Sequence, residues 1–330
     1  METTTKNKGM RTGNELMKAS LPFAVENKTK SWYYVISTIL LLLSSFAVTL
    51  SPIHIATRIP FAILTGLLMV RFFILYHDYN HYAILKDSFL GKIIMTVFGL
   101  FILAPITIWK RTHDYHHWNN SKLSNNGVGS YPLLARKDFL ALPKKEQWLY
   151  MTVRHPLTIA LGYFSLFIFD FNIKTFFQSP KKHWDSVIAL AIHITIGVFI
   201  FKTAGLIGLL ISWTLPFVIA NGSGSYLFYA QHNFPGAQYV DNKDWNYFDA
   251  AIKSTSFLKM NPIMNWFTGD IGYHHVHHLN HQIPFYRLRE AMAGIPEMQN
   301  PLVTTLNPSD IAGCLRLKVW DPELCKMAPL

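Results

Sequence analysis

Long apolar runs dominate the pattern of hydrophobic and polar positions along this chain. Residues 33–50 carry no charged side chain over 18 residues, about the length that crosses the hydrocarbon core of a bilayer. A second run covers 59–76, broken only by Arg71 near its end, and two more cover 186–201 and 204–228. These runs predict four transmembrane helices.

Two further apolar stretches do not fit this count. Residues 90–108 are nearly long enough to span a membrane, and residues 157–169 are too short to do so easily. If the first crossed alone, the histidine-rich segments before and after it would face opposite sides. We therefore expect both stretches to be interfacial or re-entrant, although hydropathy alone would allow five or six spans.

The distribution of Lys and Arg orients these helices. The connectors at 51–58 and 202–203 carry one basic residue each. Most other basic residues lie in the segments 1–30, 109–111, 136–147, 181–183 and 287–290. Because positive residues concentrate in cytoplasmic loops, we expect two hairpins with both termini in the cytoplasm.

Composition fits an all-α integral membrane protein. Half of the residues are hydrophobic, 15% are charged and the net charge is +11, which suits contact with anionic headgroups. Nucleic-acid binding is disfavoured because the basic residues are scattered at span ends. No cleavable signal is visible, and we expect the first span to act as the insertion signal. We expect a basic cytosolic tail (1–30), a membrane domain (31–292) and a C-terminal cytosolic tail (293–330).

Histidines form repeated groups at the predicted cytoplasmic ends of the spans. "HDYNH" (77–81) has i, i+4 spacing, "HDYHH" (113–117) and "HHVHH" (274–278) have i, i+3, i+4 spacing, and His232 follows the fourth span. On a helix these positions share one face. Unpartnered imidazoles at a membrane boundary are costly to desolvate. The groups therefore predict a metal centre, and eight or nine ligands imply two ions.

Spacing alone does not choose the metal, because neutral nitrogen ligands suit Fe, Cu, Zn or Ni. A bis-histidine haem site is disfavoured, since its ligands normally lie on separate helices within the bilayer. Cys314 and Cys325 have neither zinc-like nor redox-pair spacing. The isolated histidines are expected to be structural: His54, His155, His183, His193 and His281.

The three groups resemble, in order, the three histidine boxes of the membrane fatty acid desaturases (H-x-x-x-H, H-x-x-H-H, H-x-x-H-H). "FYAQHNFPGAQY" and "WFTGDIGYHHVHHLN" are similar to blocks of bacterial acyl-lipid desaturases, and the likeness covers roughly residues 30–292. It implies a non-haem centre of two Fe ions, with no catalytic residue beyond it. The implied ligands are His77, His81, His113, His116, His117, His232, His274, His277 and His278. His275 matches no ligand position.

One position departs from the family's animal stearoyl-CoA branch. There an Asn holds a metal-bound water four residues before the histidine that matches His232, whereas this chain has Phe228, with Asn233 as a substitute candidate. Metal-bound histidines commonly donate their other N–H to a carboxylate or carbonyl. Three acids near the boxes are candidates for that role, with ordinary helix-end acids as the alternative: Asp78, Asp114 and Asp270.

The resemblance implies an O₂-dependent desaturase that introduces a double bond into a lipid acyl chain. No side chain can attack an unactivated C–H bond, so the reaction needs an oxidant made from O₂. It also needs two external electrons. No flavin or fused haem module is visible, so we expect a separate donor, a ferredoxin or a cytochrome b5-like protein, and the basic cytoplasmic face favours an acidic one. We expect multi-pass insertion in a bacterial inner membrane, with the active site facing the cytoplasm.

Two other functions stay open at this point. A related hydroxylase or monooxygenase acting on fatty acyl, alkane or carotenoid substrates would carry similar boxes. A metal transporter or sensor would use the histidines reversibly, but transport needs polar groups within the spans, and only His193 lies well inside one.

Overall fold

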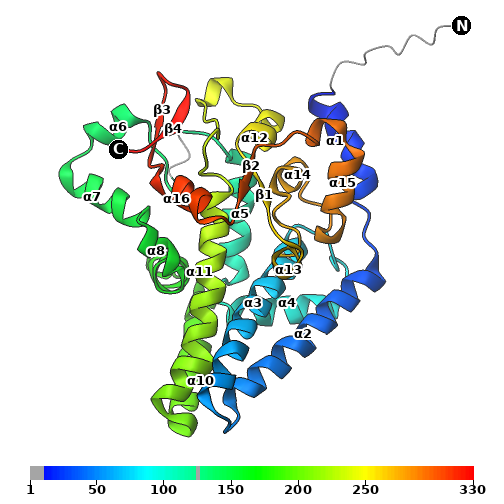
Figure 1. Ribbon diagram of the computed structural model, residues 1–330, viewed down its shortest axis with the longest axis vertical. Coiled ribbons are helices and arrows are strands. Elements are labelled where there is room, and N and C mark those ends of the chain that lie inside the picture. Colours follow the sequence, from blue (N-terminus) through cyan, green and yellow to red (C-terminus); the bar gives the residue numbers. More distant parts are fainter. Residues whose placement is uncertain (1–10, 124–126) are drawn as a thin grey trace, which may run out of the picture.

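Long apolar helices build one end of the molecule. A computed structural model describes residues 11–123 and 127–330, so part of the predicted N-terminal tail lies outside the described residues. In those residues, three helical stretches are long and apolar enough to cross a membrane, and a fourth is added if one bent helix pair counts as a span. Figure 1 shows the long helices at one end and the short elements at the other.

The first hairpin consists of α2 (Lys28–Leu50) and α3 (Ile55–Asn80). His54, expected to be structural, accepts a hydrogen bond at Nδ1 from the first turn of α3 and so caps it. Within the hairpin, the hydroxyls of Ser45 and Thr65 lie 2.8 Å apart. Because no water is available in a bilayer core, such paired polar groups keep the apolar hairpin free of unsatisfied donors.

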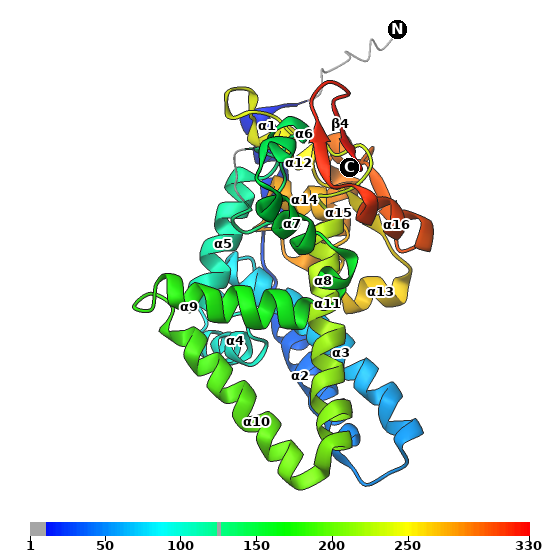
Figure 2. The ribbon, with the colours of Figure 1, turned by 90° about the vertical axis from the view of Figure 1, so that its left-hand side faces the viewer.

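The predicted spans 186–201 and 204–228 lie in one continuous stretch that doubles back. It contains α10 (Trp184–Leu209), a short π-helical segment and α11 (Leu215–Ala230), and its backbone leaves the helical conformation at Gly205, where φ is +69°. Glycine adopts this angle without steric cost. In Figure 2, α10 runs down from α9 and α11 runs back up, so the stretch is a hairpin.

Both shorter apolar stretches are broken. Within 90–108, α4 (Phe89–Phe101) and α5 (Ile106–Asn119) are bent by 92° relative to each other. At 1.5 Å per residue, α4 is about 20 Å long, short of the ~30 Å hydrocarbon core. Residues 157–169 fall within short helices that run crosswise to α11 in Figure 2: α8 (Pro156–Ala160), the π-helix η2 (Tyr163–Lys174) and the following α9 (Thr175–Gln178).

The remaining elements form a cap over one end of the long helices (Figure 1). They are α1 (Gly13–Ser20), α6 (Arg136–Ala141), α7 (Lys144–Val153), α12 (Tyr247–Lys253), α13 (Pro262–Phe267), α14 (His274–Leu279), α15 (Leu288–Gly294), α16 (Pro308–Arg316), and the strands β1 (Phe257–Lys259), β2 (Val303–Thr305), β3 (Val319–Asp321) and β4 (Lys326–Ala328). β1 pairs in parallel with β2, and β3 pairs antiparallel with β4. The structure is mostly helical as expected, but these short strands were not predicted.

The C-terminal segment packs onto the rest of the molecule. The β1–β2 pair joins Phe257 to Val303, and the backbone N–H of Trp320 donates to the carbonyl of Leu134 (3.0 Å). Residues 293–330 therefore help to hold the segment that leads into the third histidine box. The largest hydrophobic cluster extends along α3, α4, α5 and α11 and continues into α14 and α15, directly beneath that box.

Candidate metal centre

Four segments distant in the sequence bring the histidine boxes together. His77 lies in the last turn of α3 and His81 caps that helix. The second box occupies the last two turns of α5, and the third makes up all but the last residue of the six-residue α14. His232 follows α11 directly. The boxes thus lie at the ends of helices whose apolar faces pack in one core.

The nine predicted ligands fall into two groups of buried side chains. One ring nitrogen from each member lies within 4.8 Å of those of the other members of its group. The first group contains His77, His81, His113, His117 and His277. The second contains His116, His232, His274 and His278.

Hydrogen bonding does not explain the closest nitrogen contacts. Nε2 of His232 lies 3.0 Å from Nε2 of His116 and 2.9 Å from Nε2 of His274. Nε2 of His117 lies 3.2 Å from Nε2 of both His113 and His277. A ring nitrogen has one in-plane proton or lone pair, so it serves one partner at a time. Two ligands bound at about 2.1 Å and at right angles lie about 3 Å apart, so the spacing fits nitrogens that share an ion.

Burial keeps the imidazoles available as ligands. In the third box, desolvation and then the charges of neighbouring histidines lower the pKa values of His274, His277 and His278 well below the usual range. Desolvation lowers the pKa of His232 to about 4. Both ring nitrogens of His81 are buried without a hydrogen-bond partner among the described residues. Neutral rings with free lone pairs are the form that binds metal ions.

Of the four candidate supporting residues, Asp78 contacts a box histidine. Its Oδ1 accepts from Nδ1 of His77 (3.1 Å), and its Oδ2 accepts from the backbone N–H of Phe285 (2.7 Å). Both residues that touch Asp78 are buried. This contact leaves Nε2 of His77 as the free nitrogen, which is the orientation a ligand needs.

The other three candidates take different partners. Asp114 pairs with Lys110 (2.7 Å) and Asp270 with Arg289 (3.2 Å). Asn233 donates from Nδ2 to the carbonyl of Cys314 (2.7 Å). Their hydrogen bonds within the described residues join the cap and the helix ends rather than the boxes.

His281 lies closer to the centre than the sequence interpretation allowed. Its ring centroid is 4.7 Å from that of His81 and 5.1 Å from that of His117. Its Nδ1 is buried without a partner among the described residues. His281 lies outside the two nitrogen groups. The i, i+4 spacing from His277 was the signal that could have marked it.

Two cavities of opposite character meet the centre. An apolar pocket with about 740 Å³ of space between its atoms reaches His77, His113 and His274. A polar pocket of about 480 Å³ reaches His116 and His232. Phe228 lines both cavities. The centroid of its ring lies 5.1 Å from that of His116. An apolar side chain thus lies beside the histidines at the position where the animal stearoyl-CoA branch has a water-holding Asn.

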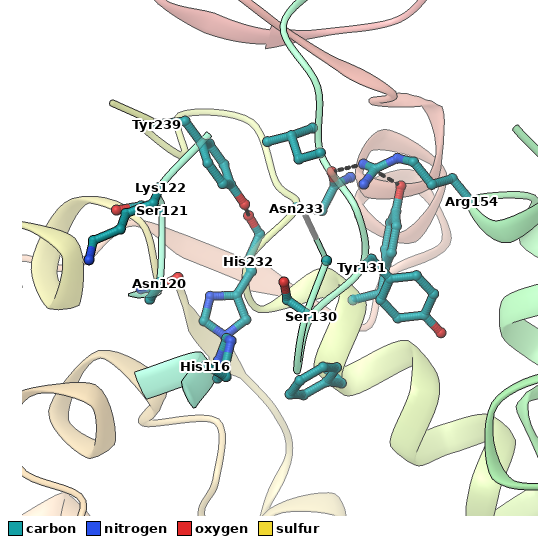
Figure 3. Close-up of a pocket in the computed structure, with 14 residues that line it drawn as sticks. His116, Asn120, Ser121, Lys122, Ser130, Tyr131, Arg154, His232, Asn233 and Tyr239 are labelled. Carbon is teal, nitrogen blue, oxygen red and sulfur yellow. Dashed lines mark hydrogen bonds between the residues drawn. The ribbon is translucent and has the colours of Figure 1, made fainter. Parts of the chain in front are cut away.

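The polar pocket contains an arginine that was not predicted from the sequence to be a site residue (Figure 3). Arg154 is 1% exposed and donates to the carbonyl of Pro132 (2.6 Å), the hydroxyl of Tyr229 (3.2 Å) and the side chain of Asn233. These partners come from distant segments. Arg154 therefore ties the end of α11 to the cap next to His232, and it gives Asn233 a structural partner.

The fold and the site together define a helical membrane protein with a buried polyhistidine centre. A family profile described as fatty acid desaturase matches residues 53–307. The chain belongs to the fatty acid desaturase family, and it is therefore an oxidoreductase of the membrane-bound desaturase class.

Three relatives illustrate the range of similarity. The chain is 27% identical over 256 residues to a fatty acid desaturase of Bacillus subtilis (strain 168), covering 77% of this chain and 72% of that protein. It is 24% identical to an sn-1 oleoyl-lipid 12-desaturase of Anabaena variabilis (82% and 78% covered). It is also 24% identical to an sn-1 acyl-lipid omega-3 desaturase (ferredoxin) of Nostoc sp. (strain 36) (84% and 79% covered).

Proposed function

We propose that the chain is an O₂-dependent di-iron desaturase that introduces a double bond into an acyl chain of a membrane lipid. The observation that carries the proposal is the pair of nitrogen groups at the end of an apolar pocket. Nine imidazoles exceed the coordination sphere of one ion, so each group would hold one. Iron is favoured because removing hydrogen from an unactivated carbon needs a metal that can change its oxidation state.

The iron ions would activate O₂ as the oxidant, and the protein's own residues would position the ions and the acyl chain. The nine histidines would hold the ions as neutral ligands. Asp78 fixes the orientation of one of them, and the apolar pocket keeps water away from the acyl chain. Reducing O₂ to two waters takes four electrons, and removing two hydrogen atoms from the chain supplies two. A separate donor would deliver the other two, and one relative's name includes ferredoxin.

The apolar pocket is long enough to take part of an acyl chain. It follows α3 from His77 to Met69, eight residues away from the histidines. At 1.5 Å per residue this distance is about 12 Å. An extended chain with carbon–carbon bonds of about 1.5 Å advances about 1.25 Å per carbon, so roughly nine or ten carbons fit beyond the first iron ligands. Relatives named acyl-lipid desaturases support a glycerolipid as the carrier of that chain.

The proposed topology has four crossings in two hairpins, α2–α3 and α10–α11. α4 and η2 would lie at the interface, and the histidine cap would face the cytoplasm of a bacterial inner membrane. The basic segments 136–147 and 181–183 support this orientation. The first belongs to α6 and α7 of the cap, and the second precedes α10, at the end of that helix opposite the hairpin turn (Figure 2).

Expression in a host of known lipid composition tests the function. We expect new unsaturated acyl chains by mass spectrometry, dependent on O₂, together with two iron atoms per purified chain. A hydroxylated product would instead identify the related hydroxylase. Metal that is washed out by mild chelation, with no change in the host lipids, would contradict the di-iron proposal.

A further inference from the structure

A second apolar cavity lies along α3 and α11 but does not reach the histidines. It is a groove bordered by α8, α13 and α16, which Figure 2 shows grouped around the upper half of α11. It extends from Leu67 and Val218 on the long helices to Ile311 and Leu315 on α16. Its empty space, including the part that is open to solvent, is about 1170 Å³, compared with about 740 Å³ for the apolar pocket on the same measure.

The groove and the apolar pocket share a thin wall. Val70 and Leu227 line both cavities, so one layer of side chains separates them. One turn away on α3, Gly66 lies so close to α11 that an added Cβ would be 2.8 Å from Cβ of Ile219. The backbones of α3 and α11 are thus in direct contact at Gly66. Nearer the histidines, the side chains of Val70 and Leu227 fill the space between these two helices.

One residue that lines the groove carries an unpaired polar group. Tyr226 is part of the lining, and its hydroxyl is buried without a hydrogen-bond partner among the described residues. Leaving a buried hydroxyl unpaired costs free energy, so a ligand that brings an acceptor oxygen would be favoured. An ester carbonyl of a glycerolipid is such an acceptor, and it is attached to an acyl chain that suits the apolar lining.

We propose that this groove binds the second acyl chain of a diacyl glycerolipid whose first chain occupies the apolar pocket. The inference rests on the proposed desaturase function. The two chains of a glycerolipid leave neighbouring glycerol carbons, which matches two cavities separated by a single side-chain layer. Moving a chain from bilayer to groove brings no hydrophobic gain, so its binding depends on packing contacts and on its covalent link to the chain in the pocket. Two-chain lipids would therefore bind better than one-chain lipids.

Photolabelling of the full-length protein in lipid nanodiscs tests this assignment. The probe is phosphatidylglycerol with a diazirine at the end of one acyl chain, compared with lysophosphatidylglycerol that carries the same group. The test variant is Ser223→Trp, which places a large ring in the groove from a residue that does not line the apolar pocket. The matched control is Val198→Trp on α10, where the side chain is 51% exposed and lines neither cavity.

The two-chain probe is expected to label groove peptides and pocket peptides, and the one-chain probe to label the pocket alone. Ser223→Trp should lower groove labelling about tenfold, while Val198→Trp leaves it unchanged. Ile311→Trp, which fills the groove from α16, repeats the test if the first variant does not insert. Groove labelling by both probes alike, or its persistence in both filled variants, would overturn the proposal.

The labelling does not require turnover, so it is independent of the proposed function. If groove labelling depends on the second chain but the protein forms no double bonds, the proposed desaturase function is wrong and the assignment of the groove stands. New double bonds without chain-dependent labelling would keep the desaturase and reject the groove.

Discussion

His277 and His275 form a matched pair for testing the metal centre. They lie two residues apart on α14 and are 0% and 1% exposed. Nε2 of His277 lies 3.2 Å from Nε2 of His117, within the first nitrogen group, whereas Nε2 of His275 lies 3.1 Å from the carbonyl of Met298. Replacing each by Ala removes the same volume from the same helix, so any difference between the variants reports the role of the nitrogen.

The two losses should differ in kind. His275→Ala removes a buried hydrogen bond and leaves a cavity, which together cost about 2–4 kcal/mol of unfolding free energy. His277→Ala leaves a similar cavity but removes a crowded ring, so the metal-free protein should lose less, about 1–3 kcal/mol. With iron present we expect the opposite order, so that His277→Ala loses more stability than His275→Ala. The first group has only four nitrogens left, and turnover should fall at least about a hundredfold, beyond what second-sphere changes cause.

Three measurements separate these outcomes: iron per chain by elemental analysis, thermal unfolding with and without iron, and desaturated product. We expect His277→Ala to lose the ion of the first group and the iron-dependent stabilisation. His275→Ala should keep both ions and most of the activity. Equal iron content and equal turnover in the two variants would refute the ligand assignment.

Three further outcomes follow from the structure. Asp78→Asn should weaken iron binding about 10–100-fold, measured by competition with a chelator, while Asp114→Asn should leave iron affinity unchanged. Equal effects in the two variants would show that the contact between Asp78 and His77 does not support iron binding. Gly272→Ala should reduce iron content in an inserted protein, because the new Cβ would lie 2.3 Å from a backbone carbonyl of β1 and displace the third box; normal iron content would contradict this. The Arg11 side chain lowers the pKa of Glu297 to about 2, chiefly by hydrogen bonding. That stabilising contribution is complete above the unfolded value near 4.5 and is lost as the pH falls from there toward 2, so acid unfolding curves of wild type and Arg11→Ala should converge in that range, and curves that stay apart at low pH would contradict the assignment.

The sequence predicted the long helices and the residues that converge, because both depend on local patterns. Uninterrupted apolar runs mark the helices of a membrane protein whatever their neighbours are. The i, i+3, i+4 spacing places imidazoles on one helix face, so the convergence of His113, His116 and His117 follows from α5 alone.

Tertiary docking decided what the sequence could not show. The assignment of His116 to one group and His117 to the other depends on where α14 and the segment after α11 lie against α5. The same is true of the strand pair β1–β2, whose members are far apart in the sequence. The candidate acids near the boxes were equivalent by spacing, but in the structure Asp78 contacts His77, whereas Asp114 pairs with Lys110.

The division of adjacent residues between the two groups has a mechanical consequence. His116 and His117 are consecutive on α5, and their Cα atoms are about 3.8 Å apart across one peptide unit. Two ions held in the two groups would therefore be connected through one short stretch of helix, which limits how far they can move relative to each other. Rotation or sliding of α5 would therefore move nitrogens of both groups at once.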